Sequence, residues 1–212
     1  MACVAVVGMA RSSLVYNKHN CNTTCGSVCV SGDVVVNGRR MRGYARLMCK
    51  SWNCPVCGPR KAYRLRKSIE EWSREHDLTR LLTLTLDPRK LGREVVAERY
   101  IKQVWAKFRV YLKRKLGRSV EYIAVMEYHK SGVPHLHALV SEYIPQRWIS
   151  NAWSRLGGGA IVHIERVMDG GNIGRYLAKY LSKNVMLSVP KGARRYMTSR
   201  GIRLWRQYRG TG

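Results

Sequence analysis

The segment from Glu121 to Glu142 constrains the fold of this chain most strongly, because its pattern is that of a β-hairpin. Two apolar-rich runs flank Lys130-Ser131-Gly132, a cluster of residues that favours a turn. Side chains of a strand point alternately to its two faces, so the parity of a position tells its face. We expect the following even-numbered positions to pack against helices, because all are apolar or aromatic: Tyr122, Ala124, Met126, Tyr128, Leu136, Ala138 and Val140.

The odd-numbered positions carry the polar groups of this hairpin, among them Glu127, His135 and His137. A hairpin centred near Ser131 places Glu127 across from both histidines, on the same face. Two imidazoles and one carboxylate that converge on a sheet face are a plausible site for a divalent metal ion. Two alternatives remain open. His129 shares the parity and could replace Glu127 as the third ligand, and the histidines could instead be polar residues on the solvated face of a half-buried strand.

The sequence Pro134-His135-Leu136-His137, flanked by apolar residues, resembles the histidine–hydrophobe–histidine motif of the HUH endonucleases. That superfamily includes rolling-circle replication initiators, conjugative relaxases and related transposases. Its members often complete the metal site with a glutamate eight residues before the first histidine, and Glu127 occupies that position. The resemblance further implies a short threonine-containing strand upstream and a tyrosine-bearing helix downstream.

Residues 79–87 fit the upstream strand. Their sequence, TRLLTLTLD, alternates so that the even-numbered leucines face one way while Thr83 and Thr85 face the other. This pattern indicates one buried and one accessible face. The resemblance places such a strand on the DNA-binding side of the sheet, and we expect Thr85 to contact DNA.

The downstream helix is predicted at residues 175–183. Two tyrosines one turn apart are often core residues, but ammonium groups are rarely buried unpaired, so two lysines on the same stripe argue against burial. Leu177 belongs to a neighbouring stripe that would pack against the protein. The spacing Tyr-x2-Lys-Tyr resembles the third motif of two-tyrosine initiators, typified by the replication proteins of single-stranded-DNA phages. Four residues share the stripe at i, i+3, i+4 and i+7: Tyr176, Lys179, Tyr180 and Lys183.

The order of predicted elements is β-α-β-β-α-β followed by a helix. A helix is expected at residues 93–115, before the hairpin, and another at residues 145–156, before a strand at residues 160–168. This order is typical of an α+β, ferredoxin-like sheet, the antiparallel arrangement of RNA-recognition domains. We expect helices on one face of the sheet and an open second face that carries the metal ligands.

The cysteines indicate a separate N-terminal metal module. Cys54 and Cys57 form a Cys-x2-Cys knuckle containing proline, which suits two thiolate ligands of a tetrahedral Zn²⁺ ion. Cys49 with either Cys25 or Cys29 would complete the site, and a redox pair is the weaker alternative because the flanks do not resemble a thioredoxin motif. A hairpin with its turn at Asn37-Gly38 is expected between these cysteines. The helix that follows Gly58-Pro59 has a basic face that we expect to bind DNA, with Arg60, Lys61, Arg64 and Lys67.

The composition identifies the class of partner. Lys and Arg number 39 against 13 acidic residues, and the resulting charge of +26 points to a polyanion, most simply nucleic acid. We expect three regions: a zinc-binding basic module at 1–75, an endonuclease domain at 76–185, and a basic segment at 186–212 that binds DNA through residues such as Arg194 and Arg195. No apolar run approaches the ~20 residues of a membrane span, and the start lacks a signal peptide. We therefore expect a cytosolic protein, in the host cytoplasm if it is viral.

The resemblance implies a rolling-circle initiator that cuts single-stranded or origin DNA. Mg²⁺ or Mn²⁺ on Glu127, His135 and His137 would assist attack by Tyr176 or Tyr180, with Lys179 stabilising the phenolate. The products would be a 5′-phosphotyrosyl linkage and a free 3′-OH. No P-loop is present, so a host helicase would have to unwind the DNA, and a host polymerase would extend it. Three alternatives remain: a two-tyrosine rolling-circle transposase, a non-enzymatic zinc-containing nucleic-acid binder, and a two-histidine-one-carboxylate iron oxygenase.

Overall fold

The computed structural model describes residues 25–27, 29–91, 96–128, 133–167, 177 and 196–204. The described residues form two compact units that divide between Lys61 and Ala62. This division lies inside helix α1 (Cys57–Glu75). No helix in the described ranges combines the length and the apolar composition needed to cross a membrane.

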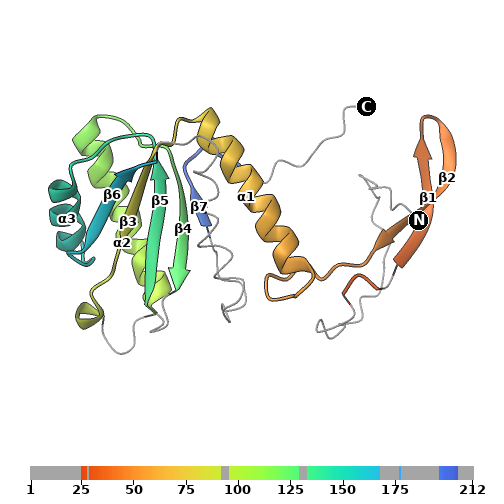
Figure 1. The fold of residues 1–212 in the computed structure, drawn as a ribbon, viewed down its shortest axis with the longest axis horizontal. Coiled ribbons are helices and arrows are strands. Elements are labelled where there is room, and N and C mark those ends of the chain that lie inside the picture. Colours follow the sequence, from red (N-terminus) through yellow and green to blue (C-terminus); the bar gives the residue numbers. More distant parts are fainter. Residues whose placement is uncertain are drawn as a thin grey trace. The chain divides into compact units, whose positions relative to one another are not determined.

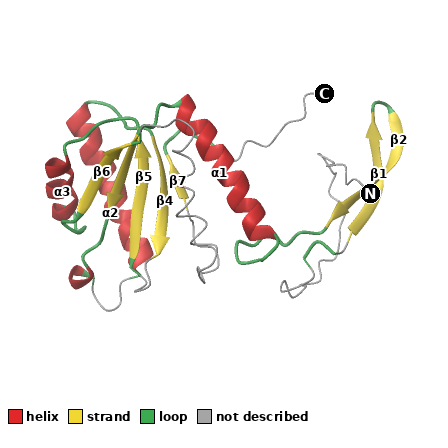
Figure 2. Ribbon diagram, viewed as in Figure 1, coloured by secondary structure: helices red, strands yellow, loops and turns green. Residues whose placement is uncertain are grey.

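The second unit is built on one antiparallel sheet (Figure 1). Its strands are β3 (Arg80–Leu84), β4 (Tyr122–Tyr128), β5 (Pro134–Val140), β6 (Val162–Arg166) and β7 (Tyr196–Thr198), in the spatial order β6-β3-β5-β4-β7. Helix α2 (Ala97–Leu116) connects β3 to β4, and α3 (Gln146–Arg155) connects β5 to β6 (Figure 2). The predicted β-α-β-β-α-β order and the α+β class are therefore confirmed.

The even-numbered side chains of the sheet form its main core, as predicted. They pack in one cluster with the buried residues of α2 and α3. Aromatic rings fill the space between the two helices, where Phe108 meets Trp153 edge to face with ring centres 5.5 Å apart. Burial of each such side chain contributes roughly 1.5–3 kcal/mol, so the even face fixes the position of the strands that carry the polar residues on the other face.

The odd-numbered face is not open along its whole length, and the prediction of an open face is wrong there. Leu81, Ile123, Val125 and Leu139 lie on this face and are at most 1% exposed. The physical reason is their apolar character, because such side chains gain free energy only when they leave water. The polar residues Glu127 and His135 occupy the end of this face near the β4–β5 turn and are half-buried.

Strand β7 was not predicted and lies within the segment expected to be a basic tail. Its three residues pair with β4 and form an edge of the sheet. Ser199 reinforces the pairing, since its backbone N–H donates to Tyr122 O at 3.0 Å and its hydroxyl accepts from Tyr122 N at 3.1 Å. Ile202 and Leu204 follow and are each 3% exposed. Part of this segment is therefore built into the fold.

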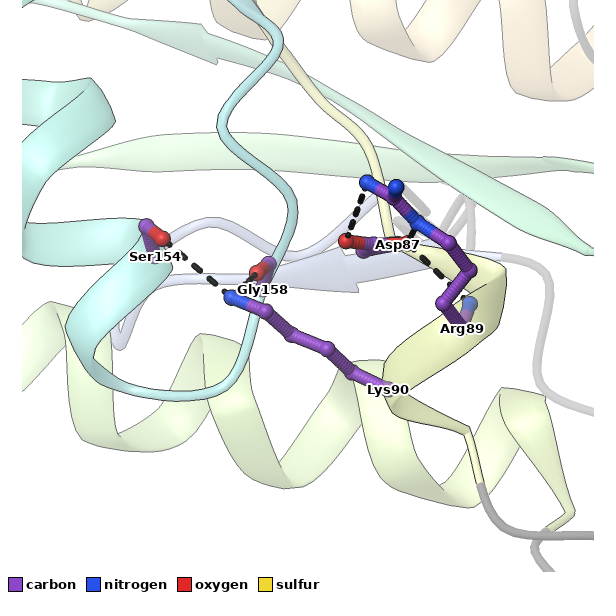
Figure 3. Close-up of polar contacts among 5 residues, drawn as sticks. All are labelled: Asp87, Arg89, Lys90, Ser154 and Gly158. Carbon is purple, nitrogen blue, oxygen red and sulfur yellow. Dashed lines mark hydrogen bonds and ion pairs between the residues drawn. The ribbon is translucent and has the colours of Figure 1, made fainter.

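The loop after β3 ties this strand to the end of α3 (Figure 3). Asp87 caps the short helix η1 (Pro88–Lys90) by accepting from the backbone N–H of Arg89 at 3.0 Å. The Arg89 side chain also donates to Asp87, and this hydrogen bond lowers the pKa of the carboxyl group. Lys90 Nζ then reaches Ser154 Oγ at 3.3 Å and Gly158 O at 3.4 Å. These contacts hold the end of β3 in place.

The first unit contains a two-stranded sheet of β1 (Cys29–Val36) and β2 (Arg39–Arg46). Asn37 and Gly38 connect the strands with φ angles of 50° and 76°, as the turn types that suit hairpin twist require. The predicted hairpin is confirmed. The predicted helix after Gly58-Pro59 is also present, and α1 begins one residue earlier, at Cys57.

Candidate functional site

The β4–β5 hairpin brings the three predicted metal ligands to one face. Glu127 pairs directly with His135, and Val125 pairs with His137. This register follows from a turn centred near residue 131, and it leaves all three polar side chains at odd-numbered positions. The backbone thus positions two imidazoles beside one carboxylate.

The donor atoms of Glu127, His135 and His137 all lie within 4.8 Å of one another. His137 Nε2 is 3.0 Å from Glu127 Oε2. Ligands bonded to one ion at about 2.1 Å are roughly 3–4 Å apart, so small side-chain rotations suffice for common coordination. His137 is 4% exposed, while the other two residues are half-buried. The group could hold a metal ion with one side accessible.

Thr83 is a residue of this site whose role the sequence did not reveal. It pairs with His137 across β3 and β5, and its Oγ1 lies 3.1 Å from His137 Nδ1. Metal-binding histidines commonly have their second ring nitrogen in such a hydrogen bond, which fixes the ring orientation. The parity of Thr83 gave its face, but its contact with His137 depends on β3 lying beside β5.

Thr85 was the threonine that we expected to contact DNA. Its hydroxyl donates to Ile161 O at 2.7 Å, and its carbonyl accepts from Trp153 Nε1 at 2.7 Å. Gly159 N also donates to this carbonyl at 2.9 Å. In the structure these polar groups connect β3 to the segment between α3 and β6.

Four cysteines form a second candidate metal site, in the first unit. The sulfurs of Cys25, Cys49, Cys54 and Cys57 all lie within 4.8 Å of one another. Sγ of Cys57 is 3.5 Å from that of Cys25 and 3.8 Å from that of Cys49. Of the two alternatives for the fourth ligand, Cys25 belongs to this group, whereas Cys29 lies in β1, where its backbone pairs with Arg46. Four converging sulfurs are the donor set of a structural Zn²⁺ site.

The electrostatics of the cysteine group also favour a cation. Burial raises the pKa of Cys57 to about 12, and its hydrogen bond with Cys25 adds to this effect. In Cys54, burial acts in the same direction but is outweighed by the backbone N–H groups of Cys57 and Val56, and the pKa falls to about 7. Several thiolates this close together repel one another. A divalent ion would compensate their charge.

The basic residues predicted to bind DNA lie along α1. Arg60 and Arg64 are exposed. Lys61 Nζ donates to Lys50 O at 2.9 Å and lies 4.7 Å from the centre of the Trp52 ring. Lys67 is 3.4 Å from Glu70. The predicted face therefore retains two exposed arginines, while the two lysines also make contacts within the protein.

The remaining predicted site residues lie outside the described residues. These include the alternative ligand His129. Leu177, which we expected on the packed stripe of the tyrosine helix, is helical and buried. The others are Tyr176, Lys179, Tyr180, Lys183, Arg194 and Arg195.

Comparison with protein families found one match. Residues 79–185 match the model of a family of replication-associated proteins, the ORF2 type. The match includes β3 and the β4–β5 hairpin, hence Thr83 and the Glu127, His135 and His137 group. Comparison with curated proteins and with solved structures found no match.

Proposed function

Because this chain belongs to the family of replication-associated proteins of the ORF2 type, we propose that it is a rolling-circle replication initiator of the HUH endonuclease type. It nicks single-stranded DNA at an origin by attack of a tyrosine. The observation that carries this proposal is the convergence of Glu127, His135 and His137 within 4.8 Å on one end of the sheet. The geometry fits the family assignment, because such a group can hold the ion that phosphoryl-transfer chemistry needs.

The residues of this group have distinct tasks. Glu127, His135 and His137 hold Mg²⁺ or Mn²⁺, which when bound polarises the scissile phosphate. Thr83 keeps the His137 ring oriented through the contact to Nδ1. The buried position of His137 restricts its motion and so keeps the ligands together before DNA arrives.

Tyr176 or Tyr180 supplies the nucleophile. A tyrosine hydroxyl has a pKa near ~10 and reacts poorly at neutral pH, so Lys179 on the same helical stripe stabilises the forming phenolate. The phenolic oxygen bonds to phosphorus, the bond from phosphorus to the 3′ oxygen breaks, and the departing oxygen takes up a proton. The 5′-phosphotyrosyl bond conserves the energy of the phosphodiester, so the ends can be rejoined without ATP. The second tyrosine attacks the next junction.

Other parts of the chain bind the DNA and the structural metal. Cys25, Cys49, Cys54 and Cys57 hold a structural Zn²⁺ ion. A host helicase supplies the single strand in the host cytoplasm, and a host polymerase extends the free 3′-OH. The proposed DNA contacts come from Arg60, Lys61, Arg64, Lys67, Thr85, Lys183, Arg194 and Arg195.

The test is formation of a covalent adduct. The full chain is incubated with Mn²⁺ and labelled single-stranded oligonucleotides, and the products are separated on a denaturing gel. We expect a shifted band that needs the metal, persists in Tyr176→Phe and in Tyr180→Phe, and disappears in the double variant. Loss in one single variant would indicate a one-tyrosine enzyme.

Two further outcomes separate the alternatives. Absence of an adduct on every oligonucleotide, with DNA binding intact, would overturn the proposal in favour of a non-enzymatic zinc-containing binder. A rolling-circle transposase would form the same adduct. An initiator, however, should sustain replication of a plasmid that has no other initiator, whereas a transposase should not.

A further inference from the structure

The β1–β2 hairpin has two faces of different chemistry, which its register defines. Side chains of directly paired residues share a face. Arg40 pairs with Val35, Arg42 with Asp33, and Tyr44 with Ser31. Together with Arg46 these residues form what we call the basic face, and every one of them is exposed: Ser31, Asp33, Val35, Arg40, Arg42, Tyr44 and Arg46.

The opposite face of the hairpin has little charge. Arg39 is its one cation and pairs with Val36 next to the turn. Met41 pairs with Val34, and two glycines, Gly32 and Gly43, pair with each other in the middle. The arginines of β2 thus fall three to one on a single face, although Arg39 and Arg40 are adjacent in sequence.

We propose that the basic face binds duplex DNA in the major groove. A two-stranded antiparallel ribbon is one of the two elements that the major groove admits. Alternate residues of a strand are about 6.7 Å apart, roughly the rise of two base pairs. Arg40, Arg42 and Arg46 can therefore reach successive phosphates or guanine edges along the groove. This proposal rests on the proposed function, since an initiator must find its origin in duplex DNA.

The features of this face favour a duplex over a single strand. Proteins that grip single strands rely on aromatic side chains on which successive bases stack, and the basic face has one aromatic residue, Tyr44. Arginines, by contrast, form bidentate hydrogen bonds with guanine in the groove. Arg42 already lies across the face, with Nη2 3.3 Å from Ser31 Oγ. Asp33 is the one acid of this face and offers an acceptor for a cytosine amino group.

The base of the hairpin is anchored at the cysteine group. Gly26 N donates to Leu47 O at 3.1 Å, and Cys49 N donates to Cys25 Sγ at 3.4 Å. Gly26 has a φ of 87°, and a Cβ at this position would lie 2.9 Å from Met48 Sδ, so the close approach requires glycine. A two-stranded hairpin alone is marginally stable. The cysteine group therefore gives the basic face a fixed support.

The test compares adjacent arginines on opposite faces. Zinc-loaded full-length protein is titrated against a labelled duplex over a series of salt concentrations, and affinity is read by fluorescence anisotropy. Each lost phosphate contact reduces the slope of log K against log salt by about 0.9. We expect Arg40→Gln to lower the slope by about that amount, the triple variant Arg40→Gln/Arg42→Gln/Arg46→Gln to lower it by about three times as much, and Arg39→Gln to leave it unchanged.

Two controls keep the result interpretable. The triple lysine variant at the same positions retains the charge and should keep the salt slope, which shows that substitution itself does not unfold the hairpin. Adduct formation on a single-stranded oligonucleotide should be the same in the triple glutamine variant as in the parent. If the parent forms no adduct, the proposed function fails, while the duplex titration still tests the basic face.

Three results would overturn the inference. An equal loss in Arg39→Gln and Arg40→Gln would mean that charge matters without regard to face. An unchanged duplex affinity in the triple glutamine variant would mean that DNA binds elsewhere. A loss that is as large for a single strand of the same length as for the duplex would make the basic face a single-strand site.

Discussion

At the scale of single residues, His137 is the most constrained group of the candidate active site. Its two ring nitrogens contact different strands, with Nδ1 at Thr83 of β3 and Nε2 at Glu127 of β4. A ring held on both sides cannot turn away without losing both contacts. The orientation of the proposed metal ligands therefore depends on a threonine that would not itself bind the metal.

This dependence gives the first prediction, that Thr83→Val weakens metal binding. Loss of a contact that orients a ligand typically costs roughly 10- to 100-fold in metal affinity, and we expect that range for Mn²⁺, measured by calorimetric titration. Thr85→Val is the matched control, because Thr85 lies on the same face of the chain segment but bonds Ile161 O. It should lose about 1 kcal/mol of stability and keep its Mn²⁺ affinity. Equal losses in both variants would refute the role of Thr83.

The second prediction distinguishes the two cysteines that the spacing alone could not separate. Cys25→Ser removes one of the four clustered sulfurs. We expect it to lower zinc affinity at least about 100-fold, while Cys29→Ser binds zinc like the parent. Competition with a chromophoric chelator measures both. The reverse order would place Cys29 in the site.

A third prediction concerns pH. Zinc binds thiolates, so protons compete with it. The pKa of Cys54 lies near 7, below its ordinary value, so this thiolate forms first as the pH rises. The pKa of Cys57 is raised to about 12, so its proton must be displaced by the metal. Zinc affinity should therefore increase with pH across the neutral range, and zinc addition should release protons into a weakly buffered solution. A pH-independent affinity would speak against thiolate ligation.

At the scale of elements, the sequence predicted what regular periodicity encodes. The alternation around Leu82 and Leu136 predicted β3 and β5, and the Asn37-Gly38 turn predicted the β1–β2 hairpin. Strand β7 has three residues, too few for a pattern, and it exists because the edge of β4 is available for pairing. The contact of Thr83 with His137 was missed for a related reason, since strand order within a sheet is a tertiary property that no local pattern contains.

The fourth prediction tests whether the segment after β7 belongs to the fold. Ile202 is 3% exposed, whereas its neighbour Arg203 is exposed. Ile202→Ala should therefore cost about 2–5 kcal/mol of unfolding free energy, and Arg203→Ala should stay within about 0.5 kcal/mol of the parent. Urea denaturation gives both values. Similar stabilities for the two variants would return this segment to the status of a tail.

At the scale of the whole molecule, the two candidate metal sites belong to different compact units. The cysteine group lies before the division at Lys61, and the Glu127, His135 and His137 group lies after it. The core that supports the second group consists of side chains from the sheet, α2 and α3, with no contribution from the cysteines among the described residues. The family match likewise begins after the cysteine group, at residue 79. These facts imply that the two metals support separable properties.

The last prediction follows from this separation. Cys54→Ser should release zinc and remove hydrogen-exchange protection from the β1–β2 hairpin, because a structural zinc site contributes folding free energy directly and an isolated hairpin is marginal. The β3–β5 pairing should keep its protection, since its buried apolar residues are unchanged. Hydrogen exchange read by mass spectrometry follows both segments in one sample, and a variant is preferable to a chelator because a chelator would also remove Mg²⁺ or Mn²⁺. If protection fell in both segments together, the two units would form one cooperative structure. If it fell in neither, the cysteine group would not be what stabilises the hairpin.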